Sequence, residues 1–311
     1  AECLERKFGR KPMVFTTNGF EAFFWDDKTG PQRQVSGIFS KADLQKLMNR
    51  REERKQLNEI KIDEKIAGRP YQMEAIRAVC DRVMKGFRKN LLVMATGTGK
   101  TRTASALTDV LSRGGYVTNV LFLADRKALV KQAKEAFKEY LPDLSLCNLV
   151  SNKEDKNARI VFSTYPTMLN AIDNTKTEDG IPLFTPAHFD LIIIDESHRS
   201  IFKKYKVIFD YFDAVLVGLT ATPKTDVDRN TYEFFELEEN VPTYAYDYDT
   251  AVNEKYLVPY YNIEIKTKYL QQGINYDDLT PEEKAAYEDA FAEDDSMPDF
   301  ITPEEINRKI R

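Results

Sequence analysis

The sequence predicts an α/β protein in which helices flank a parallel β-sheet, and three observations lead to this fold class. Between about residue 66 and residue 223, short apolar runs alternate with helical stretches, as βαβ units require. These runs are continuously apolar, which is typical of strands buried on both faces of a parallel sheet. A glycine-rich loop follows one run and an acid pair follows another, at the edge where open α/β sheets bind ligands.

Composition limits the classes of protein that remain. With 311 residues, of which 42% are hydrophobic, the chain can bury a sizeable core. The formal net charge is only −5, so any contact with nucleic acid must be local. Cys3, Cys80 and Cys147 form no C-x-x-C pair, which argues against a zinc site or a secreted disulfide scaffold. No apolar run approaches the ~18 residues of a membrane span and no signal peptide is evident, so we expect a cytoplasmic protein with no membrane partner.

The first 65 residues predict a small β-hairpin and a helix. Residues 13–26 contain two aromatic and β-branched runs joined by Asn18-Gly19, a strong hairpin signal. Ser40 precedes a helical pattern that begins at Lys41 and continues into the charged 50s. Because the chain starts without Met inside a helical pattern, we expect it to be a piece of a longer protein.

Five strands and two helices are expected in the alternating region. The strands are 91–94, 120–124, 160–163, 191–194 and 215–219, and the helices are 101–112 and 127–140. After residue 223 the alternation ends, and one further strand is expected at 261–266. Thr280 and Thr302 each precede a proline and two acids, a capping pattern that predicts two more short helices.

The loop at 94–101, which reads MATGTGKT, has the composition of a phosphate-binding loop. Its glycines let backbone N–H groups cradle phosphate oxygens at a helix N-terminus. Lys100 would contact the β- and γ-phosphates of ATP, and Thr101 would offer a hydroxyl to Mg²⁺. The nucleotide-binding residues expected here are Thr96, Gly97, Thr98, Gly99, Lys100 and Thr101. Met94 stands where the general pattern has its first glycine, so a fortuitous turn is the alternative.

Asp195 and Glu196 follow the apolar run 191–194, which places two carboxylates at the carboxyl end of a buried strand. Asp195 would hold Mg²⁺ through its water shell, and Glu196 would orient or deprotonate the attacking water. Taken alone, an acid pair of this kind is often only a favourable helix N-terminus.

Three motifs in this order resemble motifs I, II and III of superfamily 2 helicases and translocases. They are the loop at 94–101, DESH at 195–198 and LTATP at 219–223. In that family the loop reads A-x-x-G-x-G-K-T, so the first glycine is not required and Met94 replaces an alanine. The resemblance implies a RecA-like P-loop lobe that uses ATP and Mg²⁺, with residues 66–245 as the first such domain and 246–311 as a linker to a second lobe.

The resemblance also assigns roles to residues outside the main motifs. Gln72 corresponds to a glutamine that reads the adenine edge, although a surface glutamine is the simpler interpretation of this residue alone. Arg126 and Thr164 correspond to groups that contact the nucleic-acid backbone, while a surface charge at a helix start is the alternative for Arg126.

The resemblance gives His198 a place between the hydrolysis site and motif III. Its coupling partners there would be Thr220 and Thr222. The alternatives are a structural hydrogen bond for His198 and local capping for the two threonines.

The residues of these motifs most resemble those of the R subunit of type I restriction-modification enzymes. Residues 1–65 resemble the end of that subunit's nuclease domain and a connector helix, and residues 253–260 resemble the stretch that leads to the second lobe. The resemblance implies translocation of double-stranded DNA, methylase and specificity subunits as partners, and nuclease residues located before Ala1. Without the arginine finger of a second lobe, hydrolysis by this chain alone should be weak.

Two other functions remain open from the sequence. One is a general superfamily 2 helicase that acts on DNA or RNA, because the motor motifs alone do not separate it from a restriction subunit. The other is a non-catalytic ATP-binding interaction module, for which the acidic stretch after residue 270 could be a docking surface. The intact Lys100, Asp195 and Glu196 argue against the second.

Overall fold

The computed structural model describes residues 2–9, 11–151, 155–175, 182–196, 199–222, 225–260, 272–290 and 298–302. The chain divides into two compact units, Ala1–Val258 and Pro259–Arg311.

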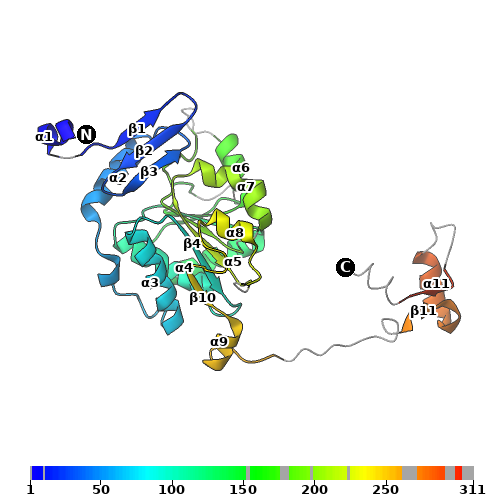
Figure 1. The fold of residues 1–311 in the computed structure, drawn as a ribbon. Coiled ribbons are helices and arrows are strands. Elements are labelled where there is room, and N and C mark those ends of the chain that lie inside the picture. Colours follow the sequence, from blue (N-terminus) through cyan, green and yellow to red (C-terminus); the bar gives the residue numbers. More distant parts are fainter. Residues whose placement is uncertain are drawn as a thin grey trace. The chain divides into compact units, whose positions relative to one another are not determined.

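The centre of the first unit is a seven-stranded, all-parallel sheet in the order β10-β4-β9-β8-β5-β7-β6 (Figure 1). Its strands are β4 (Lys89–Met94), β5 (Val120–Ala124), β6 (Leu146–Asn148), β7 (Ile160–Thr164), β8 (Leu191–Ile194), β9 (Val215–Thr220) and β10 (Tyr244–Tyr246). The five predicted strands are confirmed, β5 and β8 with the expected bounds. The edge strands β6 and β10 were not predicted, because each is only three residues long.

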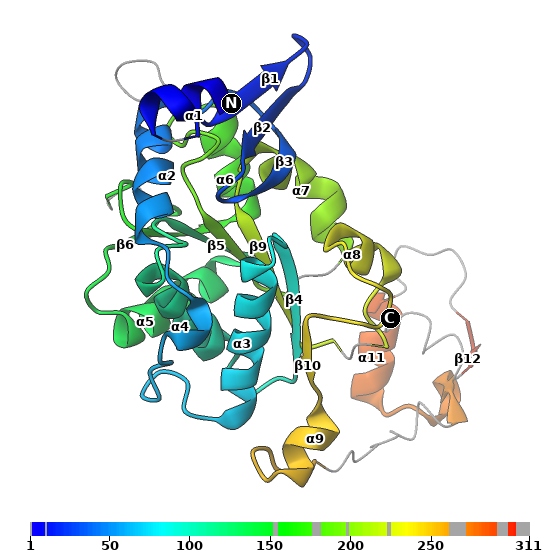
Figure 2. The ribbon, with the colours of Figure 1, turned by 60° about the vertical axis from the view of Figure 1, so that its left-hand side comes forward.

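Helices cover both faces of this sheet, as predicted (Figure 2). One face is covered by α3 (Pro70–Met84), α4 (Lys100–Arg113) and α5 (Lys127–Tyr140). The other face is covered by α6 (Tyr165–Asp173), α7 (Arg199–Tyr211) and α8 (Arg229–Phe234). Successive residues of each strand alternate between the two cores: Leu92 and Met94 face the first, Leu91 and Val93 the second. Each fully buried side chain of this kind contributes about 1.5–3 kcal/mol to folding.

The N-terminal region contains α1 (Glu2–Phe8), a three-stranded antiparallel sheet, α2 (Lys41–Glu53) and the short η1 (Leu57–Glu59). The N-terminal sheet consists of β1 (Val14–Thr17), β2 (Ala22–Asp26) and β3 (Gly30–Val35). The predicted hairpin and the helix from Lys41 are confirmed, and Ser40 forms a capping box with Asp43. Strand β3, which reads GPQRQV, extends the predicted hairpin to a three-stranded sheet.

The N-terminal sheet and α2 pack against the edge where the parallel strands begin, which we call the amino edge. Arg33 of β3 holds Asp213, just before β9, through two hydrogen bonds of 2.6 Å. Arg50 of α2 lies 2.5 Å from Asp190, the residue before β8. In Figure 2 the N-terminal sheet and α2 lie at one end of the parallel strands, and α9 (Tyr248–Asn253) lies at the other. The carboxyl edge, where the predicted site residues gather, is therefore clear of the N-terminal sheet.

The second unit has little regular structure in its described part. It contains β11 (Ile274–Asn275), η2 (Tyr276–Asp278), α11 (Pro281–Ala290) and β12 (Phe300–Ile301), and β11 pairs antiparallel with β12. The helix after Thr280 is confirmed, since Thr280 accepts a hydrogen bond of 3.4 Å from the backbone N–H of Glu283. The strand expected at 261–266 and the helix after Thr302 lie outside the described residues. Within the described part of the chain, we find no helix with the length and apolar content needed to span a membrane.

Candidate ATP site at the carboxyl edge of the sheet

The loop after β4 has the backbone shape of a phosphate cradle. Gly97 and Gly99 have φ of 86° and 88°, the left-handed region that glycine adopts without strain. A Cβ atom at Gly99 would lie 2.7 Å from Nε2 of Gln72, and one at Gly97 would lie 3.2 Å from Cδ2 of Leu257. Two conditions, positive φ and close neighbours, therefore require glycine at both positions.

Helix α4 begins at Lys100 with no side chain capping its first turn. Its first N–H groups and the helix dipole therefore give this end the partial positive charge that attracts phosphate. The Lys100 ammonium donates a hydrogen bond of 3.4 Å to the carbonyl of Met94, so it lies over the loop. Thr96 is exposed and Thr101 is half-buried, whereas the hydroxyl of Thr98 donates to the carbonyl of Ala95 at 2.6 Å. The hydroxyl of Thr98 thus shapes the loop, whereas Thr101, in the first turn of α4, stays the predicted metal ligand.

Gln72 is buried, with 2% of its surface exposed, so the interpretation as a surface glutamine is wrong. Its side-chain N–H donates to the carbonyl of Thr98 at 3.0 Å, and the hydroxyl of Tyr71 donates to the same carbonyl at 2.9 Å. Among the described residues, Oε1 of Gln72 has no hydrogen-bond partner. Gln72 therefore supports the loop and keeps one buried acceptor available.

A group of aromatic residues beside the loop was not predicted from the sequence. Tyr71 stacks on Tyr246, with ring centroids 4.0 Å apart, and meets the ring of Tyr256 edge-on at 5.1 Å. Arg69 donates to the hydroxyl of Tyr71 at 2.8 Å and lies over the ring of Tyr256. The segment that follows β10 is thereby held against the phosphate loop. The tyrosine-rich composition after residue 232 was the available signal, but it did not identify which tyrosines reach the loop.

The acid pair extends β8 towards the phosphate loop. The backbone N–H of Asp195 donates to the carbonyl of Leu123 at 2.9 Å, which fixes its position at the carboxyl edge. Burial, and then the charge of Glu196, raise the pKa of Asp195, while Lys100 opposes this shift. Glu196 has φ of 50°, a conformation that costs a non-glycine residue about 1–3 kcal/mol. Among the described residues, the two carboxylates thus lie together with Lys100 as their main opposing charge, an arrangement that a divalent cation would relieve.

Thr220 ends β9, which lies between β4 and β8 in the sheet and so separates the phosphate loop from the acid pair. Thr220 is 1% exposed, and its hydroxyl accepts a hydrogen bond of 3.1 Å from the backbone N–H of Thr222. Local capping, one of the two interpretations of these threonines, is therefore present. His198 lies outside the described residues, so its coupling role remains a prediction.

The two predicted nucleic-acid contacts differ in accessibility. The side chain of Arg126, at the start of α5, is 80% exposed and lies 3.5 Å from Asp125. Thr164 is 5% exposed, and its hydroxyl is hydrogen-bonded to that of Thr167 at 2.9 Å. Both residues lie at the carboxyl edge, but of the two only Arg126 presents its polar group to solvent.

Residues 65–225 match the protein family described as "Type III restriction enzyme, res subunit". The chain belongs to this restriction-enzyme family. The match covers the phosphate loop, the acid pair and both threonines of motif III, and it confirms the predicted helicase-like lobe of a restriction R subunit.

Two curated relatives of this chain are endonuclease subunits of type I restriction enzymes. The chain is 31% identical over 233 residues to the EcoKI endonuclease subunit of Escherichia coli, which covers 66% of this chain and 19% of that subunit. It is 33% identical over 210 residues to the EcoAI endonuclease subunit of Escherichia coli, with 66% and 25% covered. The chain therefore spans a quarter or less of the length of these two relatives.

Two solved structures are also similar. One is a fragment described as the HsdR subunit of a type I restriction enzyme from Vibrio vulnificus, with 26% identity, a TM-score of 0.42, and coverage of 79% of this chain and 43% of that one. The other is the Hef helicase domain of Pyrococcus furiosus, with 20% identity, a TM-score of 0.47, and coverage of 80% and 54%.

Proposed function

We propose that this chain is the ATP-hydrolysing part of a type I restriction subunit that translocates double-stranded DNA before cleavage. The observation that carries the proposal is the arrangement of three adjacent strands, β4, β9 and β8, which bring the glycine loop, Thr220 and the acid pair to one edge. Open α/β sheets bind their ligands at this edge.

Each residue at the carboxyl edge would have a separate role in ATP hydrolysis. Thr101 and Asp195 would hold Mg²⁺, whose positive charge stabilises the phosphates when it is bound. Lys100 would neutralise the β- and γ-phosphates, and Glu196 would orient the attacking water. The raised pKa of Asp195 supports this assignment, because burial and then the charge of Glu196 disfavour its ionised form, which a bound cation would stabilise.

Gln72 would recognise the adenine base. Its Oε1, which has no partner among the described residues, is a buried acceptor that the exocyclic amino group of adenine could satisfy, and its N–H group contacts the loop that would bind the phosphates. Base recognition and phosphate binding would therefore be linked through one side chain.

The contacts with DNA and with other subunits are a further part of the proposal. Arg126 and, after a local rearrangement, Thr164 would contact the DNA backbone, which suits a motor that must act on any sequence. Residues 1–65 would be the end of a nuclease domain, 66–245 the first motor domain and 246–311 the linker to a second lobe. The methylase and specificity subunits would be the partners, in the cytoplasm.

The test is the ATPase rate of the R subunit that contains this chain, with and without double-stranded DNA. We expect stimulation by double-stranded DNA and its complete loss in Lys100→Ala, because a phosphate-binding charge is removed. Lys61→Ala, which removes a lysine that is 86% exposed, is the matched control and should retain the rate. Stimulation by RNA but not by DNA would contradict the restriction assignment, and full activity of Lys100→Ala would contradict the motor mechanism.

The isolated chain should bind ATP but hydrolyse it slowly. An arginine from a second lobe contributes roughly 10³–10⁵ to the rate in related motors, and no match to such a motif was found in this sequence. Single-turnover hydrolysis by the 311-residue chain, compared with the full subunit, measures this difference.

A further inference from the structure

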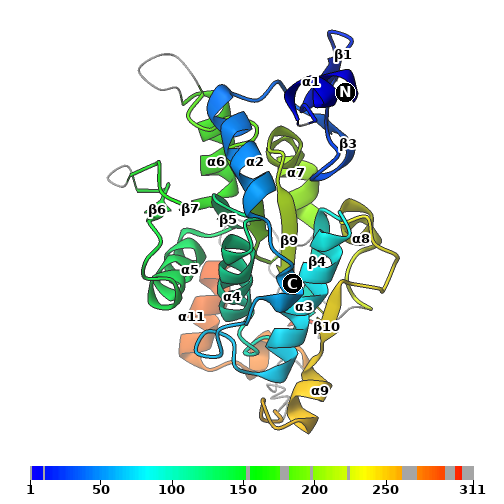
Figure 3. The same ribbon diagram turned by 90° about the vertical axis from the view of Figure 1, so that its left-hand side faces the viewer.

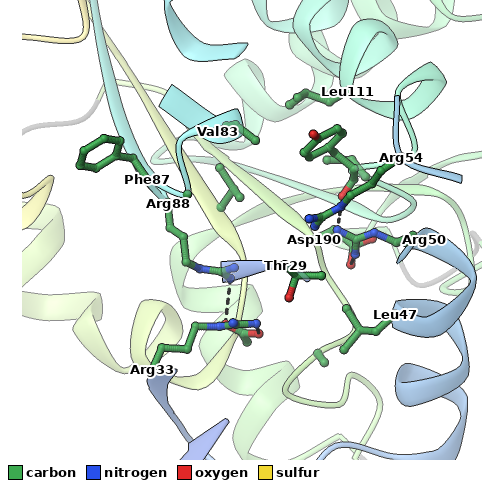
Figure 4. Close-up of a pocket in the computed structure, with 16 residues that line it drawn as sticks. Thr29, Arg33, Leu47, Arg50, Arg54, Val83, Phe87, Arg88, Leu111 and Asp190 are labelled. Atoms are coloured by element: carbon green, nitrogen blue, oxygen red, sulfur yellow. Dashed lines mark hydrogen bonds and ion pairs between the residues drawn. The ribbon is translucent and has the colours of Figure 1, made fainter. Parts of the chain in front are cut away.

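A cavity lies between the N-terminal sheet, α2 and the amino edge of the parallel sheet (Figure 4). Its volume is about 50 Å³, and it is partly open to solvent. Apolar side chains such as Leu47, Val83 and Leu111 form part of its wall, and four arginines line the rest: Arg33, Arg50, Arg54 and Arg88. In Figure 3, α2 and the N-terminal sheet lie at this end of the strands, remote from α9 at the carboxyl edge. The cavity is thus separate from the ATP site.

Positive charge exceeds negative charge around this cavity. Asp213 is held by Arg33 at 2.6 Å and by Arg88 at 2.8 Å. Asp190 is held by Arg50 at 2.5 Å and by Lys46 at 3.0 Å, and it also accepts backbone hydrogen bonds from Thr118 and Asn119. Among the described residues that line the cavity, four arginines face two carboxylates, so two formal positive charges remain uncompensated there.

Of the four arginines, Arg54 is the one that forms no ion pair with a described residue. Its guanidinium donates one long hydrogen bond, of 3.4 Å, to the carbonyl of Lys28, and it lies over the ring of Tyr116. Its Nε atom is buried and has no partner among the described residues. The neighbouring carboxylate of Asp26 is already bound by Arg51 at 2.5 Å. Arg50, which is 9% exposed, likewise has a buried Nε without a partner in the described part of the chain.

The surplus charge also affects neighbouring titratable groups. Burial lowers the pKa of Arg88 to about 10, against the pull of Asp213, and Arg33, Arg50 and Arg54 add to this shift. Burial, followed by the charge of Lys46, lowers the pKa of His188 to about 4, so this histidine is neutral at physiological pH. Positive charge is therefore unfavourable at this junction, and a bound anion would relieve it.

We propose that this cavity binds a small oxyanion of the phosphate type, with Arg54 as its main ligand. A guanidinium with free donors matches the geometry of phosphate oxygens, and the apolar wall strengthens charge-assisted hydrogen bonds by excluding water. The anion would complete the contact between the N-terminal sheet and the parallel sheet. This proposal is independent of the ATP site, since it rests on residues at the opposite edge.

The test uses inorganic phosphate as the probe and the 311-residue chain with Lys100→Ala, which weakens phosphate binding at the glycine loop. Calorimetric titration without Mg²⁺, with chloride at equal ionic strength as the reference, should detect binding. Adding Arg54→Gln should weaken this binding by about tenfold or more, because the main charged donor is lost. Adding Arg54→Lys should give an intermediate affinity, since the charge remains but the forked geometry does not.

The matched control is Arg229→Gln, which removes an arginine that is 73% exposed and lies on α8. It should leave phosphate affinity unchanged. Equal affinities of the Arg54→Gln and Arg229→Gln chains, or no phosphate binding in the Lys100→Ala chain, would overturn the proposal.

A second measurement needs no substitution at the site. Phenylglyoxal modification, followed by mass spectrometry of the peptides, should be slowed by phosphate at Arg54 but not at Arg229. Absence of protection at Arg54 would count against the site even if Arg54→Gln failed to fold. A 5′-phosphorylated oligonucleotide that protects Arg54 at lower concentration than free phosphate does would also overturn the proposal, because the ligand would then be a DNA end.

Discussion

Each edge of the parallel sheet carries a partly buried aspartate, and the surroundings shift the pKa values of these two residues in opposite directions. At the carboxyl edge, burial and then the charge of Glu196 raise the pKa of Asp195, whereas the charge of Lys100 lowers it by less. At the amino edge, burial also favours the neutral form of Asp213, but Arg88 and Arg33 outweigh it and lower the pKa. The comparison separates a carboxylate that two arginines neutralise from one that has only the opposing charge of Lys100 among the described residues, a difference that agrees with the predicted ligand site at the carboxyl edge.

The largest expected effect is at the amino edge. Asp213→Ala leaves Arg33 and Arg88 without their common partner, so it should lower the free energy of unfolding by about 3–5 kcal/mol. Urea denaturation followed by circular dichroism measures this change. A loss below ~1 kcal/mol would mean that these ion pairs are solvated. Asp213 would then not be more strongly stabilised by its surroundings than Asp195 is.

A smaller effect is expected from the helix that carries Arg50. Ser40→Ala removes the capping box of α2, in which the Ser40 hydroxyl accepts a hydrogen bond of 3.1 Å from the backbone N–H of Asp43. The free energy of unfolding should fall by about 1 kcal/mol, while nucleotide affinity stays unchanged. Reduced ATP affinity in this variant would show that the two edges are not independent.

The smallest effect on stability is expected at the carboxyl edge. Asp195→Asn removes a carboxylate whose charged form is disfavoured by burial and by Glu196, so the free energy of unfolding should rise by about 0.5–1 kcal/mol while ATP hydrolysis is lost. A clear loss of stability would contradict the interpretation of Asp195 as a site residue under strain.

The two edges should also respond in opposite ways to pH. Because the pKa of Asp195 is raised in the folded protein, its contribution to stability falls as pH rises above the usual value of 3.8. The pKa of Asp213 is lowered, so its contribution is present above 3.8 and is lost as pH falls through the lower folded value. The stability gain of Asp195→Asn should therefore grow with rising pH, and the loss caused by Asp213→Ala should shrink in acid. Unfolding curves for each variant and wild type at several pH values provide the comparison.

The carboxyl edge was largely predictable from the sequence, since its chemistry lies in short local motifs. The runs before Met94 and Asp195 are continuously apolar, and each motif directly follows its strand, so strand positions also placed the site residues. Local patterns did not reveal the support of the loop by Gln72, because this contact joins residues 26 positions apart.

The amino edge was not predictable in the same way. The pair Arg33 and Asp213 is separated by 180 positions and the pair Arg50 and Asp190 by 140, and each residue alone resembles an ordinary surface charge. Strand β3 was missed because Val35 is its only buried residue, and β10 was missed because it is three residues long and lies at an edge. Structure that depends on distant pairing leaves no periodic signal in the sequence.

Strands β8 and β9 are short, and each has different contacts at its two ends. Asp190 and Asp213 tie their starting ends to α2 and β3, and Asp195 and Thr220 stand at their finishing ends. A strand of four to six residues spans only ~13–20 Å, and close packing on both faces prevents it from stretching. The N-terminal sheet and α2 are thus attached to the same two strands that carry the predicted ATP-site residues. Because neither strand can stretch, a shift of a whole strand along its axis would move the residues at both of its ends.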